Sequence, residues 1–184
     1  MNAPFLLILT GPPGAGKTTV ATLVAEYFTP SVVIEGDALW AHVVRGFIEP
    51  WEKDSDPQNR SLVRASLAAA VRLTSSGYAT VLSGHVGPSF LDIMRQELVG
   101  LRAPVRYVVL RPSLEECLAH RVERRSDPRH AGALGDETII RHLYRTYSNL
   151  EAFEGHVLDT SGLTTQEAAS VVIEELESPR FALR

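Results

Sequence analysis

A glycine-rich segment near the start of the sequence has residue types and a spacing that suit phosphate chemistry. Residues 11–18 read GPPGAGKT and fit the pattern G-x-x-x-x-G-K-[ST] at every fixed position. Glycine adopts backbone angles that other residues avoid, so consecutive N–H groups can turn inward around an anion. The pattern predicts a loop that holds nucleotide phosphates, formed by Gly11, Pro12, Pro13, Gly14, Ala15, Gly16, Lys17, Thr18 and Thr19.

The polar side chains at the end of this segment have separate expected roles. Lys17 can reach the β- and γ-phosphates, and it is one of only two lysines beside sixteen arginines, so compositional background does not explain it. The hydroxyl group of Thr18 suits Mg²⁺, and that of Thr19 is expected close to the α-phosphate. We therefore expect ATP with Mg²⁺ as the ligand.

An acidic residue follows the second apolar run of the sequence. Asp37 ends the segment VVIEGD, and the carboxyl ends of parallel strands meet at the ligand crevice of a sheet. A carboxylate there can accept the proton of an attacking hydroxyl group or hold Mg²⁺ through water. Aspartate also caps helices well, so the alternative is an N-cap for a helix over residues 38–44.

These residues need a scaffold, and the hydrophobic pattern predicts a parallel sheet. Compact apolar runs without polar alternation are typical of strands that are covered on both faces. The sequence has five of them: Phe5–Leu9, Val32–Glu35, Ala79–Leu82, Val105–Leu110 and His156–Leu158. We expect the first to lead directly into the phosphate loop.

Helical spacing separates these runs, which predicts an α/β fold in one domain over residues 1–184. Ser113 and Glu116 form a predicted N-terminal cap, while Gly77 and Gly100 are predicted to end helices. Two polar segments, residues 50–59 and 126–136, are predicted to be loops. The predicted helices cover Thr18–Tyr27, Pro57–Ser75, Ser89–Val99, Leu114–Arg125, Asp136–Ala152 and Thr165–Glu177.

The phosphate loop, the GD pair at Asp37 and the segment RVERR resemble the small P-loop kinases and phosphotransferases. This group includes shikimate and gluconate kinases, adenylate-kinase-like enzymes, chloramphenicol phosphotransferase and zeta-toxin-like AAA-type ATP-binding proteins. The resemblance implies a three-layer P-loop NTPase fold, with a five-stranded parallel sheet, helices on both faces, a small lid near residues 126–136 and a substrate-side insertion near residues 38–75.

The same resemblance implies roles for two arginines on the helix that leads into the lid. Arg121 and Arg125 have the family's R-x-x-x-R spacing and share one face of a helix. In the group, one such arginine packs near the adenine and the other reaches the transferring phosphate. The alternative is a solvated basic helix end, stabilised by the helix dipole.

The remaining site residues follow the strands. The resemblance implies that Thr160, Ser161 and Gly162 border the adenine; the alternative is a turn before the last helix. The third strand ends in Ser83-Gly84-His85, where many relatives carry an acid, so Asp37 is the main carboxylate expected near the metal. His85 is a candidate for substrate binding, with a purely structural role as the alternative. Trp40 and Trp51 either shape the acceptor pocket or, for Trp40, join the core.

Composition excludes several classes of function. The net charge of −4 and the absence of a clustered basic face make nucleic acid an unlikely partner. Cys117 is the only cysteine, which excludes an intramolecular disulfide and a cysteine-based zinc site. No apolar run approaches the ~20 residues needed to span a bilayer, and none resembles a signal core. We expect a cytoplasmic monomer or homodimer with no membrane contact.

Together these features predict an ATP- and Mg²⁺-dependent phosphotransferase that moves the γ-phosphoryl group to a hydroxyl group of a small molecule. Lys17, Asp37, Arg121 and Arg125 are the expected catalytic residues, and Asp37, Trp40 and His85 are expected at the acceptor. One alternative is a nucleoside or nucleotide kinase. Another is a nucleotide-regulated ATPase or binding switch without an acceptor substrate. Variable loops shape the acceptor pocket in this fold, so the sequence names no acceptor.

Overall fold

Five parallel strands form the centre of the molecule in the computed structural model, which describes residues 3–124 and 136–183, without the side chains of 121–124. The strand order is β2-β3-β1-β4-β5, and every neighbouring pair is parallel. The strands are β1 (Leu6–Thr10), β2 (Ser31–Glu35), β3 (Ala79–Ser83), β4 (Val105–Arg111) and β5 (Val157–Asp159). The predicted five-stranded parallel sheet is therefore confirmed.

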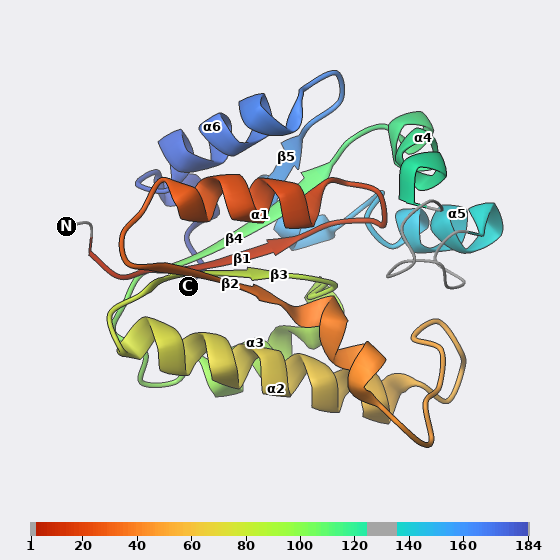
Figure 1. Ribbon diagram of the computed structural model, residues 1–184, viewed down its shortest axis with the longest axis horizontal. Coiled ribbons are helices and arrows are strands. Elements are labelled where there is room, and N and C mark those ends of the chain that lie inside the picture. Colours follow the sequence, from red (N-terminus) through yellow and green to blue (C-terminus); the bar gives the residue numbers. More distant parts are fainter. Residues whose placement is uncertain (1–2, 125–135, 184) are drawn as a thin grey trace.

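Helices cover both faces of this sheet and make three layers (Figure 1). Helices α1 (Lys17–Glu26) and α6 (Thr165–Glu175) pack together on one face, and α2 (Asp56–Ser75) and α3 (Leu91–Glu97) pack together on the other. Helices α4 (Leu114–Arg124) and α5 (Glu137–Arg145) lie beyond the carboxyl ends of the strands, on the side of the phosphate loop. The carboxyl ends of the strands therefore lie between the two helical layers and face the helices α4 and α5.

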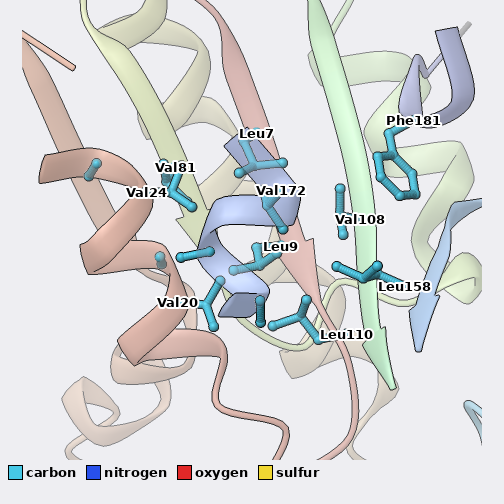
Figure 2. Packing of buried hydrophobic residues seen from close by; sticks show 14 of the residues in the cluster. Leu7, Leu9, Val20, Val24, Val81, Val108, Leu110, Leu158, Val172 and Phe181 are labelled. Carbon is cyan, nitrogen blue, oxygen red and sulfur yellow. The ribbon is translucent and has the colours of Figure 1, made fainter. Parts of the chain in front are cut away.

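The core explains why the strand sequences lack polar alternation. All five residues of both β1 and β3 are buried, because each strand meets side chains from both helical layers. In the layer of α1 and α6, Val20, Val24 and Val172 pack onto Leu7 and Leu9 (Figure 2). Burying a side chain of this size contributes roughly 1.5–3 kcal/mol. The two central strands are thus firmly fixed, and so are the loops that leave their carboxyl ends.

Three predicted segments differ from the structure. The helix expected over residues 136–152 ends at Arg145, and a turn and the 3₁₀ helix Glu151–His156 follow it. Helix α2 begins inside the predicted loop 50–59, since Pro57 sits in its first turn, where its missing N–H costs no hydrogen bond. The helix expected over residues 38–44 is the 3₁₀ helix Gly36–His42.

The predicted helix cap at Ser113 and Glu116 and the predicted helix ends at Gly77 and Gly100 are confirmed. The Ser113 Oγ accepts the backbone N–H of Glu116, and the Glu116 carboxylate accepts the backbone N–H of Ser113, which is a complete capping box for α4. Gly77 and Gly100 have the positive φ angles of 99° and 83° that follow a helix end. Among the helices in the described parts of the chain, none has the length and apolar character required to cross a membrane.

Candidate active site

The phosphate loop depends on glycines that touch backbone atoms of other elements. Gly11 has φ +147°, and a Cβ atom there would lie 2.2 Å from the carbonyl oxygen of Leu110 in β4. Gly14 has φ +88°, and its Cβ would lie 2.5 Å from the carbonyl oxygen of Cys117 in α4. Both distances are shorter than any Cβ atom tolerates, so the loop can adopt this conformation only with glycine at both positions.

Lys17 turns its side chain back over the loop. The residue is 7% exposed, and its ammonium group donates hydrogen bonds to the carbonyl oxygens of Gly11 at 3.1 Å and Pro12 at 3.2 Å. The left-handed Gly16 (φ 77°) starts α1, so the unpaired N–H groups of the first helical turn join those of the loop. This arrangement of N–H groups and one cation fits a polyphosphate.

Helix α4 supports the loop from behind. The Nδ1 atom of His120 lies 2.9 Å from the carbonyl oxygen of Gly14. On the same helix, the Glu116 carboxylate accepts the backbone N–H of Gly162 at 2.7 Å, which ties the loop after β5 to α4. This hydrogen bond is the largest of the causes that lower the pKa of Glu116, and the Ser113 hydroxyl is the next. The loop after β5 and the phosphate loop are therefore both bonded to α4, and the expected contact of Thr160–Gly162 with the adenine stays a prediction.

The three residues of that loop differ in what they expose. Ser161 and Gly162 are exposed, whereas Thr160 is 6% exposed and its Oγ1 has no hydrogen-bond partner among the described residues. The backbone N–H of Thr160 donates to the carbonyl oxygen of Arg111 at 3.3 Å. Only Ser161 and Gly162 can thus meet a bound molecule directly, while Thr160 anchors the turn.

Asp37 lies at the carboxyl end of β2 with an exposed side chain. Its Oδ1 accepts the backbone N–H of His85, which follows β3, at 2.8 Å. It lies within the 3₁₀ helix Gly36–His42, whose N-terminal flanking residue is Glu35, so the alternative reading of Asp37 as an N-cap is wrong. The contact to His85 crosses from one strand end to the next, as the parallel register of β2 and β3 requires.

Gly84 makes this approach possible. A Cβ atom at Gly84 would lie 3.0 Å from the Oδ1 of Asp37 and 3.3 Å from its backbone nitrogen. Any side chain at this position would therefore push the carboxylate away from the end of β3. Ser83, where many relatives have an acid, is 3% exposed at the last position of the strand.

His85 belongs to a hydrogen-bond chain that reaches into the core. Its Nδ1 lies 2.8 Å from the hydroxyl oxygen of Tyr147, which lies 3.1 Å from the Oγ1 of Thr10. That Oγ1 accepts the backbone N–H of Val86 at 3.2 Å. Thr10 is fully buried and Tyr147 is 1% exposed. The chain joins the end of β1 to the segment after α5 and to the turn after β3.

The surroundings of His85 disfavour its charged form. Its pKa lies below the ordinary value of 6.5, chiefly because the protein removes water from the imidazole ring. The charge of Lys17 acts in the same direction, whereas the charge of Asp37 opposes it. The direction of this shift favours the neutral imidazole.

A cavity of about 310 Å³ opens beside this histidine. The turn after β3 forms one side of the cavity and the segment after α5 forms the other. Glu151 in its lining has a positive φ of 50°, which is uncommon for a residue with a side chain. The lining residues are His85, Gly87, Pro88, Ser89, Thr146, Tyr147, Asn149, Leu150 and Glu151.

Arg111 fixes the segment that carries Tyr147. This residue ends β4, and its guanidinium group donates to the carbonyl oxygen of Tyr147 at 3.0 Å and pairs with the carboxylate of Glu154. The Glu154 carboxylate accepts the backbone N–H of Leu150 at 3.2 Å. One side of the cavity is thus clamped to the sheet by an ion pair.

Trp40 does not line this cavity. Its indole N–H donates to the Oδ1 of Asn59 at 2.9 Å, and the ring packs against the core layer of α2 and α3. Trp51 is half-buried in the turn before α2. The structure therefore brings Asp37 and His85 together, and it uses Trp40 to attach the 3₁₀ helix after β2 to α2.

The arginines and the lid that the sequence suggests fall largely outside the described residues. Arg121 lies on α4, whose backbone is described there, and Arg125 and the segment 126–135 lie beyond the described ranges. The last residue of the expected lid, Asp136, caps α5 by accepting the backbone N–H of Thr138 at 2.7 Å.

The donor set fits Mg²⁺ held mainly by a substrate. Thr18 has an exposed side chain on the first turn of α1, and Asp37 supplies an exposed carboxylate. Within residues 3–124 and 136–183, no three His, Cys, Asp or Glu side chains gather in a way that could hold a metal by themselves. This matches the preference of Mg²⁺ for one or two protein groups together with phosphate oxygens and water.

Two residues of this site, Thr10 and Tyr147, were not predicted from the sequence. Thr10 lies one position beyond the predicted strand Phe5–Leu9, although β1 includes it, and Tyr147 falls in the predicted helix over residues 136–152, which in fact ends at Arg145. The only available signal was the fifth position of β1, where a hydroxyl replaces an apolar side chain next to the phosphate loop. Nothing local in the sequence indicates that Tyr147 meets it.

The comparisons with known proteins concern the family and the fold. The sequence matches the model of a family described as AAA domain over residues 6–150. Among curated proteins, none matches the sequence significantly.

Solved structures with similar folds include three that span nearly the whole chain. The APS kinase of Mycobacterium tuberculosis, solved with AMPPNP and APS, has a TM-score of 0.68 at 19% identity and covers 97% of this chain and 100% of its own. The tunicamycin resistance protein of Deinococcus radiodurans has a TM-score of 0.65 at 20% identity, covering 96% of each chain. The shikimate kinase of Acinetobacter baumannii, solved with shikimate, has a TM-score of 0.59 at 20% identity, covering 96% and 94%. These likenesses establish a P-loop kinase-like fold.

Proposed function

The chain belongs to the AAA domain family of P-loop proteins, and we propose that it is an ATP- and Mg²⁺-dependent phosphotransferase acting on a hydroxyl group of a small molecule. The P-loop domain implies nucleotide binding. Transfer to an acceptor goes further, and it rests on one observation: an exposed carboxylate after β2 is fixed to the turn after β3, the neighbour of the strand that leads into the phosphate loop.

That carboxylate belongs to Asp37. One of its oxygens accepts the N–H of His85 at 2.8 Å, which fixes the group and leaves the other oxygen for a second partner. The charges of Asp37 and Lys17 both act on the pKa of the same His85, the first raising it and the second lowering it, which supports placing the carboxylate and the ammonium group in one site. A general base and a phosphate-binding cation in one crevice suit phosphoryl transfer to a hydroxyl group.

In the proposed reaction, the acceptor hydroxyl gives its proton to the carboxylate of Asp37. The hydroxyl oxygen forms a bond to the γ-phosphorus of ATP, and the bond from that phosphorus to the β,γ-bridging oxygen breaks, which releases ADP. Lys17 and the N–H groups of the loop stabilise the negative charge on the phosphate oxygens. Arg121 and Arg125 enter the proposal through their spacing in the sequence alone.

Mg²⁺ belongs to the proposal as the ion that neutralises charge on the β- and γ-phosphates. The hydroxyl of Thr18 and, through water, the carboxylate of Asp37 would hold it. Ser161 and Gly162 are proposed to border the adenine through their exposed backbone.

The test is Asp37→Asn, assayed by ADP release with a panel of sugars, sugar acids, nucleosides and amino alcohols. The asparagine oxygen can still accept the His85 N–H, so the variant changes the charge and basicity while keeping this contact. We expect turnover with the acceptor to fall by about 10²–10⁴-fold, with ATP affinity nearly unchanged.

The exposed Asp54 offers a matched control, because Asp54→Asn removes the same charge from the turn before α2. Its turnover should equal that of the unchanged protein. If Asp37→Asn retains full turnover, Asp37 is not the base. ADP release that no acceptor stimulates would instead support a nucleotide-regulated ATPase.

A further inference from the structure

In the chain of hydrogen bonds from the core to His85, the donor of each bond can be assigned, starting from a backbone N–H. The backbone N–H of Val86 can only donate, and it is shared between the carbonyl oxygen of Gly84 at 3.0 Å and the Oγ1 of Thr10 at 3.2 Å, so the hydrogen of the Thr10 hydroxyl cannot point to it. Thr10 is fully buried, and the hydroxyl of Tyr147 at 3.1 Å is the only other partner of its Oγ1 among the described residues.

The direction then passes from group to group. A buried hydroxyl hydrogen without a partner costs free energy, so the Thr10 hydroxyl donates to the Tyr147 oxygen. The hydrogen of the Tyr147 hydroxyl is then left for the Nδ1 of His85, which lies at 2.8 Å. Burial raises the pKa of Tyr147, while Thr10 and the backbone N–H of Gly11 act against that rise, as donors to a phenol oxygen do.

An imidazole that accepts a hydrogen bond at Nδ1 carries its proton on Nε2. Reversing the chain would require Nδ1–H of His85 to donate to Tyr147 and Tyr147 to donate to Thr10, which would leave the Thr10 hydrogen unpaired in the core. The same reasoning excludes the imidazolium form. Among the described residues, Nε2 of His85 has no hydrogen-bond partner, and His85 lines the cavity of about 310 Å³.

We infer that His85 is locked as the Nε2–H tautomer and that Nε2–H donates a hydrogen bond to the acceptor molecule in this cavity. The inference rests on the proposed function for the identity of the bound molecule. His85 thereby has two donors with separate tasks: its backbone N–H holds the base Asp37, and its ring N–H holds the acceptor. Tyr147 is a positioning residue that acts through His85.

The lining also indicates what chemical group meets Nε2–H. The described lining supplies hydroxyl and amide groups from Ser89, Thr146 and Asn149, one carboxylate from Glu151, and no lysine or arginine. A carboxylate or phosphate on the acceptor would lack a cation there and would face Glu151. The acceptor therefore presents an uncharged oxygen, that of a hydroxyl, ether or carbonyl group, to this cavity.

The tautomer can be read without turnover, from the ¹⁵N–¹H correlations of histidine rings in ¹⁵N-labelled protein. His85→Gln assigns the signal by removing it. We expect the unchanged protein to show a protonated Nε2 and an unprotonated Nδ1 for His85. A protonated Nδ1, alone or in the imidazolium form, would overturn the inference.

Tyr147→Phe then tests the source of the lock. It removes the donor to Nδ1 and keeps the ring, so we expect Nδ1–H to become populated. Tyr107→Phe is the matched control, because Tyr107 is also a fully buried tyrosine and its hydroxyl donates to the carbonyl oxygen of Val86 at 2.8 Å without touching His85. The control should leave the tautomer unchanged. An unchanged tautomer in Tyr147→Phe would contradict the positioning role.

Kinetics with an acceptor found in the ADP-release panel provide the second measurement. Tyr147→Phe should raise the KM of the acceptor roughly tenfold and leave the KM of ATP within about twofold. The reason is that loss of the fixed His85 tautomer weakens one hydrogen bond, which is made to the acceptor. Equal changes in both KM values would contradict the inference. Best turnover with an acceptor whose anionic group binds at His85 would overturn the assignment of an uncharged oxygen. If no acceptor in the panel stimulates ADP release, the proposed function fails while the tautomer result stands.

Discussion

The phosphate loop and the His85 side of the crevice lie at neighbouring strand ends but are held in different ways. The loop is held by backbone against backbone: the Cβ positions of Gly11 and Gly14 lie 2.2 Å and 2.5 Å from carbonyl oxygens of β4 and α4. The His85 side is held by side chains, through Thr10, Tyr147 and the carboxylate of Asp37.

This difference predicts how each side responds to change. Backbone packing that excludes every Cβ tolerates almost no substitution, whereas a side-chain hydrogen-bond network can be altered one link at a time. The loop meets the phosphates, a group common to all nucleotide triphosphates. The His85 side meets the acceptor, which is the part of the reaction that varies within this fold.

The largest expected effect is that of Gly14→Ala. Gly14 and Gly100 have nearly equal φ angles of 88° and 83°, but only Gly14 has backbone atoms within 4 Å of its Cβ position. Both alanine variants bear the left-handed strain of roughly 1–2 kcal/mol, and Gly14→Ala adds about 1–3 kcal/mol from overpacking against Cys117.

Urea unfolding of both variants measures this difference, and isothermal titration measures ATP affinity. We expect Gly14→Ala to weaken ATP binding more than about tenfold and Gly100→Ala to leave it unchanged. If the two variants lose equal stability, packing against α4 does not hold the loop. The claim that the phosphate loop is held by backbone contacts would then be wrong.

The next effect is that of Thr10→Val, which keeps the shape of the side chain and removes the hydroxyl. The buried hydroxyl of Tyr147 then loses its Thr10 partner, and the N–H of Val86 keeps only the carbonyl oxygen of Gly84 at 3.0 Å, at a total cost of about 1–3 kcal/mol. The matched control is Thr80→Val in β3: Thr80 is equally buried, and its hydroxyl makes only a long contact of 3.4 Å to the carbonyl oxygen of Tyr78.

Thermal or urea unfolding should show Thr10→Val clearly less stable than Thr80→Val. Because Thr10 immediately precedes the phosphate loop, the ATP affinity of Thr10→Val also sharpens the comparison. We expect that affinity to change less than about twofold, since the loop relies on its own backbone. A large loss would mean that the hydrogen-bond chain supports both sides.

The smallest effect is expected for Glu116→Gln and depends on pH. The N–H of Gly162 and then the hydroxyl of Ser113 lower the pKa of Glu116 in the folded protein below the ordinary value of 4.5. The unfolded chain therefore binds this proton more readily, so the carboxylate stabilises the fold above about pH 4.5 and this contribution is lost as the pH falls through the lowered pKa.

The free energy of unfolding at neutral pH and about one unit below 4.5 tests this sign. Glu116→Gln should be slightly less stable than the unchanged protein at neutral pH and should lose less stability on acidification. The exposed Glu115 on the same turn provides the control variant Glu115→Gln. A strong loss of ATP affinity in Glu116→Gln would show that side chains, too, hold the nucleotide side.

Much of the fold could be predicted because its signals are local. Each strand lies within one residue of its predicted ends. In the central strands β1 and β3, continuous burial on both faces requires a continuous apolar run. The predicted helix over 136–152 was too long, because its second half has helix-compatible residues that tertiary contacts of Arg111 and Glu154 hold in another conformation. The alternative of an N-cap role for Asp37 is wrong for a similar reason: its partner, His85, lies 48 positions away.

The sequence by itself determined the phosphate loop, because an anion nest is built from consecutive backbone N–H groups and the glycines that permit their geometry. It also determined the sheet, because each strand is marked by its own compact run of apolar residues. Only the tertiary structure decided what faces that loop. Thr10 and Tyr147 lie 137 positions apart, and His85 lies 62 positions from Tyr147. A hydrogen bond between side chains needs the correct distance and direction in space, and neither is encoded in the spacing of residues that the sheet brings together.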